Sequence, residues 1–242
     1  MTLFNGYVWQ RPQRRVWVVV CMAILILLGL GIWQLQRLEW KNNLIAHIAR
    51  ANEREPLQNW PQSPKDASDF GWRRVQLSGV FLHDKEMWLA ARYHEGQLGF
   101  HILTPFLLDD GRVVLLNRGW VPNEKKEASA RLEGQVGGAI SLLAQIRTDR
   151  DQNPFTPEAD VAKNIWFWRD ITKMRTATGL ELEPITADVI HMLPPGGFPI
   201  ASSGDIRLPN DHLGYALTWF SLALAAAVMA VLYHLKPLEP SQ

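Results

Sequence analysis

One histidine at the start of an apolar segment is the strongest chemical signal in this chain. His212 lies in the run NDHLGYALTWF (210–220), and no Asp, Glu, Lys, Arg or His occurs from 213 to 233. On a helix, residues three, four and seven positions apart share a face. The residues that share the face of His212 in this way are Tyr215, Ala216, Trp219 and Ala223. An imidazole beside aromatic rings fits an axial ligand of a haem-like macrocycle, and it fits equally an interfacial residue of an ordinary aromatic belt.

Basic side chains in two other regions are candidates for binding the carboxylates of an amphipathic ligand. Arg37 and Lys41 lie one turn apart, just beyond the first apolar segment, and Arg118 follows the apolar run VVLL within NRGWVP. Arginine contacts carboxylates in a bidentate manner. Arg37 and Lys41 also fit snorkelling anchors at the end of a membrane span. Arg118 is either paired inside its domain or facing a partner, and the sequence leaves both interpretations open.

Two apolar segments must position these residues. Residues 16–33 hold no charged side chain, and this segment, like 213–233, has about the 20 residues that a helix needs to cross a bilayer. The length of the first segment, and the lack of an A-x-A-like cleavage site after it, argue against a signal peptide. We therefore predict an α+β membrane protein, with transmembrane helices at 16–34 and 210–235 flanking a mostly antiparallel β extramembrane domain.

Two spans place both ends of the chain on one side of the membrane. Three arginines and no acidic residue precede the first span, although three basic residues follow it within a similar distance. The positive-inside rule favours cytoplasmic termini, and a long middle region is translocated largely regardless of its charge. We predict that 1–15 and 236–242 are cytoplasmic and that 35–209 lies on the outer side of the membrane.

The middle region has the pattern of one β-rich domain. Apolar residues at helical spacing predict that the first helix continues to about residue 51, and three prolines in 55–64 indicate a linker. The β-rich core is predicted at about 70–193, with DDG (109–111) as a hairpin turn. The first predicted strand starts near Trp72. The others are predicted at 86–92, 98–108, 112–120, 139–147, 165–168 and 188–193. Asp170 is expected to cap a helix at 171–178 that Gly179 ends.

Small residues in the second span predict close helix packing. Ala223 with Ala227, and Ala226 with Ala230, form small-xxx-small pairs that Gly29 and Gly31 of the first span, or a partner's helix, could receive.

Composition and motifs exclude several functions. The net charge is +1 without a basic cluster, which argues against nucleic-acid binding. Cys21 is the only cysteine and lies in the first apolar segment, so disulfide and copper-thiolate chemistry are unsupported. G-x-S-x-G, HExxH, P-loop and dinucleotide-binding motifs are missing, and His83, His94 and His101 fit no metal set. We predict that the protein is not an enzyme, since a membrane-anchored enzyme would need a catalytic group that the sequence does not display.

Six motifs in order along the chain resemble the Surfeit locus protein 1 (Surf/Shy) family of cytochrome c oxidase assembly factors. The motifs are GIWQLQRLEWK (31–41), WRRVQLSGVF (72–81), GQLGFHILTPF (96–106), GRVVLLNRGWVP (111–122), WFWRD (166–170) and NDHLGYALTWFSLA (210–223). NRGWVP and HLGYALTWF together are very specific. The resemblance extends over essentially the whole chain.

The resemblance implies a multi-pass protein of the inner membrane, with the domain at 35–209 in the periplasm, that assists insertion of haem a into subunit I of the oxidase. Expected partners are subunit I, haem a synthase and the lipid bilayer. It implies His212 as the ligand of the haem iron, and we expect Tyr215 and Trp219 as the macrocycle wall and Arg37 or Arg118 as propionate partners. The alternative is a haem-independent scaffold or chaperone that stabilises nascent subunit I.

This chain departs from the family pattern beside the expected ligand. The family commonly has two asparagines before the histidine, and here the second is Asp211. A carboxylate could strengthen His212 as a ligand through a hydrogen bond, or it could repel haem propionates.

Overall fold

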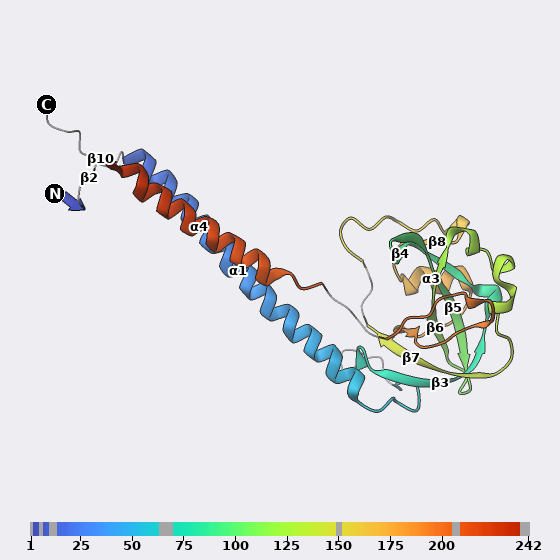
Figure 1. The fold of residues 1–242 in the computed structure, drawn as a ribbon. Helices are drawn as coiled ribbons and strands as arrows, with labels where there is room; N and C mark the ends of the chain where they lie inside the picture. The colour runs from blue at the N-terminus through green and yellow to red at the C-terminus, as the bar shows by residue number, and fades with distance from the viewer. Residues whose placement is uncertain are drawn as a thin grey trace. The chain divides into compact units, whose positions relative to one another are not determined.

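The computed structural model describes residues 2–4, 7–9, 14–62, 70–148, 152–204 and 209–237. They form two compact units (Figure 1). One unit comprises Met1–His47 and Arg207–Gln242, and the other comprises Ile48–Ile206. The first unit contains a pair of long helices and the second contains the β-rich domain.

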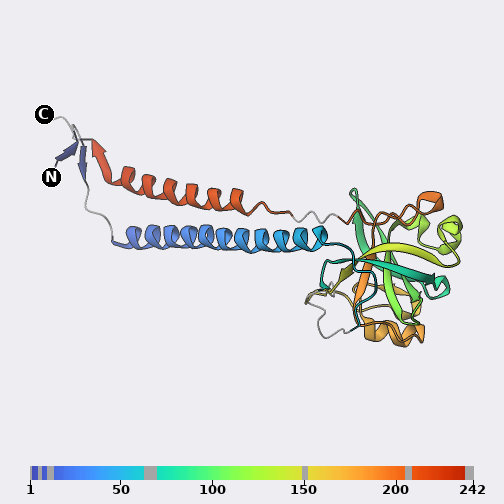
Figure 2. The ribbon, with the colours of Figure 1, turned by 90° about the horizontal axis from the view of Figure 1, so that it is seen from below.

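The long helices are α1 (Arg14–Glu53) and α4 (His212–His234). Both are long and apolar enough to cross a membrane. Within the first unit they lie side by side and antiparallel (Figures 1 and 2), since the ring of Trp17 near the start of α1 lies 5.3 Å from that of His234 at the end of α4. No proline interrupts α1, which runs two residues beyond the predicted end at 51.

The two helices pack with a seven-residue period. Ala216, Ala223 and Ala230 are the buried alanines of α4, whereas the predicted small-xxx-small pairs have a four-residue spacing. A seven-residue repeat keeps one seam of a helix facing its neighbour along several turns. Gly31 of α1 is buried in this seam, and a Cβ added there would lie 2.5 Å from the ring of Phe220. A Cβ added at Gly29 would meet no described atom within 4 Å, so within this helix pair Gly31 packs against Phe220 and Gly29 receives no alanine, and the alternative of a partner's helix stays a prediction.

Short strands near the two ends of the chain form a small antiparallel sheet that the sequence analysis did not predict. Its strands are β1 (Thr2–Phe4), β2 (Tyr7–Trp9) and β10 (Leu235–Pro237), in the order β1-β2-β10. The pairing of β2 with β10 joins segments that are more than 220 residues apart in the sequence.

Among the described residues, the second unit is built on a seven-stranded sheet and includes a short α-helix. Its strands are β3 (Arg74–Phe81), β4 (Met87–His94), β5 (Gln97–Leu108), β6 (Val113–Pro122), β7 (Ile140–Arg147), β8 (Ile165–Trp166) and β9 (Thr186–Val189). The helix is α3 (Ile171–Thr178), and the 3-10 segments are η2 (His83–Lys85), η3 (Asn123–Lys125), η4 (Ala128–Gly134), η5 (Val161–Lys163) and η6 (Pro195–Gly197). Two short strands differ from expectation, because β8 ends at Trp166 and β9 begins two residues before the predicted strand.

The sheet curls until five of its strands form a closed ring. The strand order is β3-β7-β9-β6-β5-β4-β8, and β3 pairs in addition with β5. Gly79 of β3 makes this closure possible, because a Cβ there would lie 2.0 Å from the carbonyl oxygen of Leu107. The pairs β6–β9 and β4–β8 are parallel. The sheet is therefore mixed, but five of the seven pairings between its described strands are antiparallel, in agreement with the prediction of a mostly antiparallel domain.

Two hydrophobic cores lie on opposite faces of the same strands. The ring encloses side chains from all five of its strands, among them Val75, Phe106, Leu116, Leu142 and Val189. Leu115 of β6 points the other way and packs with Trp166 of β8 and Met174 of α3. Because both faces of β6 are buried, its sequence VVLL is apolar without alternation.

Local capping determines the ends of α3 as the sequence predicted. The carboxylate of Asp170 accepts a hydrogen bond from the backbone N–H of Lys173 at 3.0 Å. Gly179 ends the helix in the left-handed conformation, with φ of 69°.

Candidate functional site

His212 is the first residue of α4 and is hydrogen-bonded to α1. Its Nδ1 lies 2.7 Å from Oε1 of Gln34. An amide oxygen only accepts, so Nδ1 is the donor, and in the neutral form of the ring Nε2 keeps its lone pair. The imidazole is half-buried. This tautomer is the one in which Nε2 can bind a metal.

A second side-chain contact holds the chain just before α4. Nδ2 of Asn210 donates to Oδ1 of Asn42 at 2.8 Å. Asp211, between Asn210 and His212, is the N-cap residue, but its exposed carboxylate makes no capping hydrogen bond. The start of α4 is therefore held to α1 by Asn210 and His212 rather than by Asp211.

The residues predicted to share the face of His212 differ in their burial. Ala216 and Ala223 are buried at the helix seam, whereas Tyr215 is 58% exposed and Trp219 is half-buried. These two aromatic rings are therefore available to a ligand or to lipid, and the alanines are not.

Arg37 lies on the exposed surface of α1, three residues after Gln34. Its guanidinium carbon is 4.0 Å from the centre of the Trp40 ring, a cation–π contact. Among the described residues it forms no ion pair, so its charge is not neutralised there. The side chain can reach an anion once it leaves Trp40.

His212 is the candidate iron ligand on the helix pair. The described part of the chain contains no group of three or more His, Cys, Asp or Glu side chains that could hold a metal ion. A macrocycle brings four iron ligands of its own, so one imidazole with a free Nε2 and adjacent aromatic rings fits a haem with a single protein ligand.

Arg118 lies within the β domain and is paired there. Its side chain is 1% exposed, lies 3.9 Å from Oε2 of Glu86 and donates to the carbonyl oxygen of Gly134. Its position explains the burial: in the β5–β6 register Ile102 faces Gly119 and Leu103 faces Asn117, so Arg118 is the extra residue of a β-bulge. Of the two interpretations left open, the internal pairing holds, and this disfavours Arg118 as a propionate partner.

The surroundings of Arg118 form a buried cluster with two arginines and one glutamate. Arg131 also donates to Glu86. His83 has Nε2 2.9 Å from the carbonyl oxygen of Val136, so Nε2 carries its proton and Nδ1 accepts from Arg118 at 3.3 Å. Burial lowers the pKa of Arg118 to about 10, which leaves the guanidinium charged at neutral pH, and burial also lowers the pKa of His83.

A second buried cluster joins residues from three of the sequence motifs. Asp188 accepts hydrogen bonds from Arg169 of WFWRD at 2.8 Å, Arg147 at 2.7 Å and Asn117 of NRGWVP at 3.1 Å. His101 of GQLGFHILTPF contacts Asn117 at 3.3 Å. The cluster therefore connects strands β5, β6, β7 and β9 and the segment before α3 around one carboxylate.

The charges of this second cluster shift two pKa values. Burial alone would raise the pKa of Asp188, but the guanidinium groups of Arg169 and Arg147 outweigh burial and lower it. Burial lowers the pKa of His101 to about 4. Asp188 is therefore an anion and His101 neutral at neutral pH, which is the arrangement of a structural ion network.

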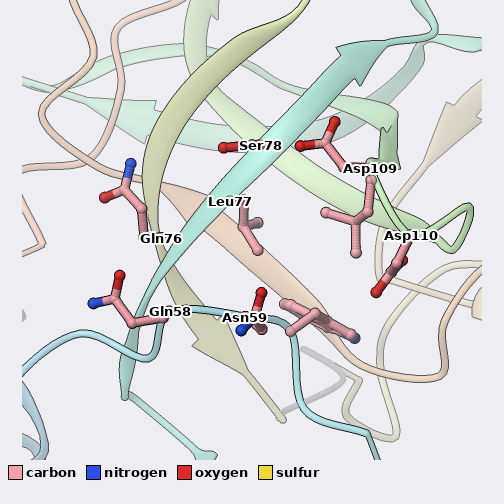
Figure 3. Close-up of a pocket in the computed structure, with 9 residues that line it drawn as sticks. Gln58, Asn59, Gln76, Leu77, Ser78, Asp109 and Asp110 are labelled. Atoms are coloured by element: carbon pink, nitrogen blue, oxygen red, sulfur yellow. The ribbon is translucent and has the colours of Figure 1, made fainter.

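A polar cavity of about 200 Å³ lies at one edge of the β domain (Figure 3). Its lining residues are Gln58, Asn59, Trp60, Gln76, Leu77, Ser78, Leu108, Asp109 and Asp110. The carboxylate of Asp110 is engaged by Arg112 at 2.7 Å. None of the predicted site residues lines this cavity.

Sequence reasoning did not single out Gln34, Asn42 or Asp188. Gln34 lies within GIWQLQRLEWK and Asn42 directly follows it. A side-chain amide close to the apolar segment was the only feature of the sequence that could have indicated a role for them. No feature of the sequence indicated the role of Asp188, because an isolated acidic residue in a strand does not reveal that two arginines distant in the sequence donate hydrogen bonds to it.

Comparison with known proteins gives one consistent result. The model of the SURF1 family matches residues 21–224. Surfeit locus protein 1 of Mus musculus is 35% identical over 216 residues, which cover 83% of this chain and 70% of that protein. The protein of the same name from Takifugu rubripes is 33% identical over 83% of this chain and 89% of its own length. The one from Homo sapiens is 33% identical over 88% of this chain and 75% of its own length.

Proposed function

This chain belongs to the SURF1 family, and on that premise we propose that it is an assembly factor for cytochrome c oxidase that holds haem a on its way to subunit I. Haem a is cargo in this proposal and not a resident catalyst. The single observation that carries the proposal is the bond of 2.7 Å between His212 Nδ1 and Gln34 Oε1. That bond leaves Nε2 as the atom available to iron.

The chain's residues have separate roles in holding the cargo. His212 supplies one axial ligand, and Tyr215 and Trp219 lie along the macrocycle. Arg37 is the candidate partner for a propionate, because its charge is exposed and unpaired among the described residues, while Arg118 is buried against Glu86. A single neutral imidazole binds haem less firmly than two axial ligands do, which suits a carrier that must release it.

We further propose that α1 and α4 cross the inner membrane, with both termini in the cytoplasm and the β domain in the periplasm. Their length and apolar composition support a membrane location. His212 then lies near the outer boundary of the hydrocarbon layer, where its ring and those of Tyr215 and Trp219 suit an interface. Subunit I and haem a synthase are the proposed partners at this boundary.

The test is the absorption spectrum of the full-length protein purified in detergent after co-expression with a haem a synthase. We expect a haem a spectrum from the native chain and its loss in His212→Ala. The matched control is His47→Ala. His47 is an exposed histidine on the other long helix, α1, so its substitution should leave the spectrum unchanged. An unchanged spectrum and stoichiometry in His212→Ala would refute His212 as the ligand.

The same preparation distinguishes the scaffold hypothesis. A haem-independent scaffold predicts that subunit I co-purifies with the chain from cells that make no haem a, and that the purified protein is colourless. A haem carrier predicts colour in the absence of subunit I.

A further inference from the structure

The bond between Gln34 and His212 assigns a role to a residue that the sequence motifs did not distinguish. Gln34 is half-buried on α1, three residues after the buried Gly31 that packs against Phe220. Its amide therefore projects from the turn of α1 that follows this contact with α4. The contact joins residues 178 positions apart in the sequence.

A neutral imidazole has one N–H, and only the other nitrogen can bind a metal. The hydrogen bond made by one ring nitrogen determines which nitrogen is free. At His212 the acceptor is the amide oxygen of Gln34, so the proton resides on Nδ1 and Nε2 is free. The same bond restricts rotation of the ring about its attachment to α4.

The chemical nature of the acceptor determines how strong a ligand the imidazole is. A carboxylate that accepts from a ligating histidine increases the basicity of the ring. A neutral amide orients the ring in the same way but adds no negative charge. Asp211, the nearest carboxylate in the sequence, is not the acceptor that the structure records at Nδ1.

We propose that Gln34 is the positioning residue of the haem site: it selects the His212 tautomer with a free Nε2 and, as a neutral amide, limits the strength of this ligand so that the haem can be released. This inference rests on the proposed function. It assigns to α1 a direct part in a site whose predicted iron ligand belongs to α4.

The first experiment needs no haem. Nitrogen-15 NMR of the full-length apoprotein, labelled at histidine and assigned by comparison with His212→Ala, reports which ring nitrogen of His212 is protonated. We expect the Nδ1–H form in the native chain and in Gln34→Glu. In Gln34→Leu we expect a mixture of the two tautomers. An Nε2–H form in the native chain would overturn the proposal whatever its haem content.

The second experiment measures how fast haem a leaves the protein for an excess of apomyoglobin. Gln34→Leu is expected to release haem roughly 10- to 100-fold faster, the effect typical of losing such an outer partner. Gln34→Glu keeps the size of the side chain and adds a charge, so it should release haem more slowly and have a lower reduction potential.

Gln36 supplies the matched controls. It is an exposed glutamine on the same helix, two residues away, and its side chain makes no hydrogen bond with any residue that the structure describes. Gln36→Leu and Gln36→Glu should release haem at the native rate, which separates the specific contact from a general change in polarity. Circular dichroism and gel filtration identify any variant that fails to fold. If Gln34→Leu fails to fold, the comparison of Gln34→Glu with the native chain tests the proposal.

The outcomes separate the two proposals. If His212→Ala loses haem while both Gln34 variants release it at the native rate, the role of Gln34 is refuted and the proposed function stands. If His212→Ala keeps its haem, the proposed function fails, and the tautomer measured in the apoprotein still decides what Gln34 does to the ring.

Discussion

Nη2 of Arg169 donates to Oδ1 of Asp188 at 2.8 Å inside the β domain, where both side chains are less than 10% exposed. The first of these residues belongs to WFWRD, after β8, and the second lies in β9, which pairs in parallel with β6. The ion pair thus joins the segment before α3 to the centre of the sheet. A buried carboxylate destabilises the fold once its cationic partner is removed, so Asp188 depends on its arginines.

Arg169→Met should destabilise the β domain by about 3 kcal/mol, because it leaves a buried carboxylate with Arg147 as its remaining guanidinium partner. Urea unfolding of the full chain in detergent, followed by tryptophan fluorescence, measures this loss. The matched control is Lys163→Met, which removes a solvent-exposed pair with Asp160 and should leave the midpoint unchanged. Equal midpoints for Arg169→Met and the native chain would contradict a structural role for the cluster.

The β domain should lose stability as the pH falls from about 6.5 to about 4. His101 stays neutral in the folded domain down to a pKa of about 4, whereas in the unfolded chain it binds a proton near its ordinary pKa of 6.5. The unfolded state therefore binds more protons in this window, and acidification favours it by at most about 3 kcal/mol. Below this window the lowered pKa of Asp188 acts in the same direction.

His101→Gln provides the check on that pH dependence. Glutamine keeps an acceptor for the Asn117 amide, which lies 3.3 Å from Nδ1 of His101, and it does not titrate. The plot of unfolding free energy against pH should be flatter between 6.5 and 4 in this variant. His191→Gln, a substitution of an exposed histidine, should keep the native slope. A native slope in His101→Gln would mean that other groups cause the acid sensitivity.

Gly31→Leu should separate α1 from α4, because even a Cβ at this position would lie 2.5 Å from the Phe220 ring. Overpacking of this kind typically costs about 1–3 kcal/mol. Spin labels on the exposed native Cys21 and on a cysteine at the exposed Leu224 report the distance between the helices. We expect a longer and broader distance distribution. Gly29→Leu, at a position with open space within 4 Å, should reproduce the native distribution and is the control.

Asp211→Asn should leave the stability of α4 unchanged, since the Asp211 side chain makes no capping hydrogen bond. It removes one negative charge beside His212, so bound haem a should have a higher reduction potential than in the native chain. Potentiometric titration of the two purified proteins measures the difference. A marked loss of helicity in Asp211→Asn would instead show that the carboxylate stabilises the start of the helix through its charge.

Several elements followed from the sequence because their causes are local. The two long helices are encoded by apolar runs without charge or proline, and the ends of α3 by a capping aspartate and a glycine with positive φ. Gly111, with φ of 85°, forms the turn predicted from DDG. Propensity, capping and turn chemistry act within a few residues, so a single sequence is enough to reveal them.

The partners of the polar residues depended on contacts across the fold. Nothing near Arg118 in the sequence indicates Glu86 or the bulge that turns its side chain inward, and nothing near His212 indicates Gln34. Ring closure by β3 and β5, and the parallel pairing of β6 with β9, likewise join segments whose individual patterns allow several neighbours. The sequence by itself determined that a histidine begins an apolar helix, whereas the tertiary structure decided which of its nitrogens is free, because that depends on a hydrogen bond to a residue 178 positions away.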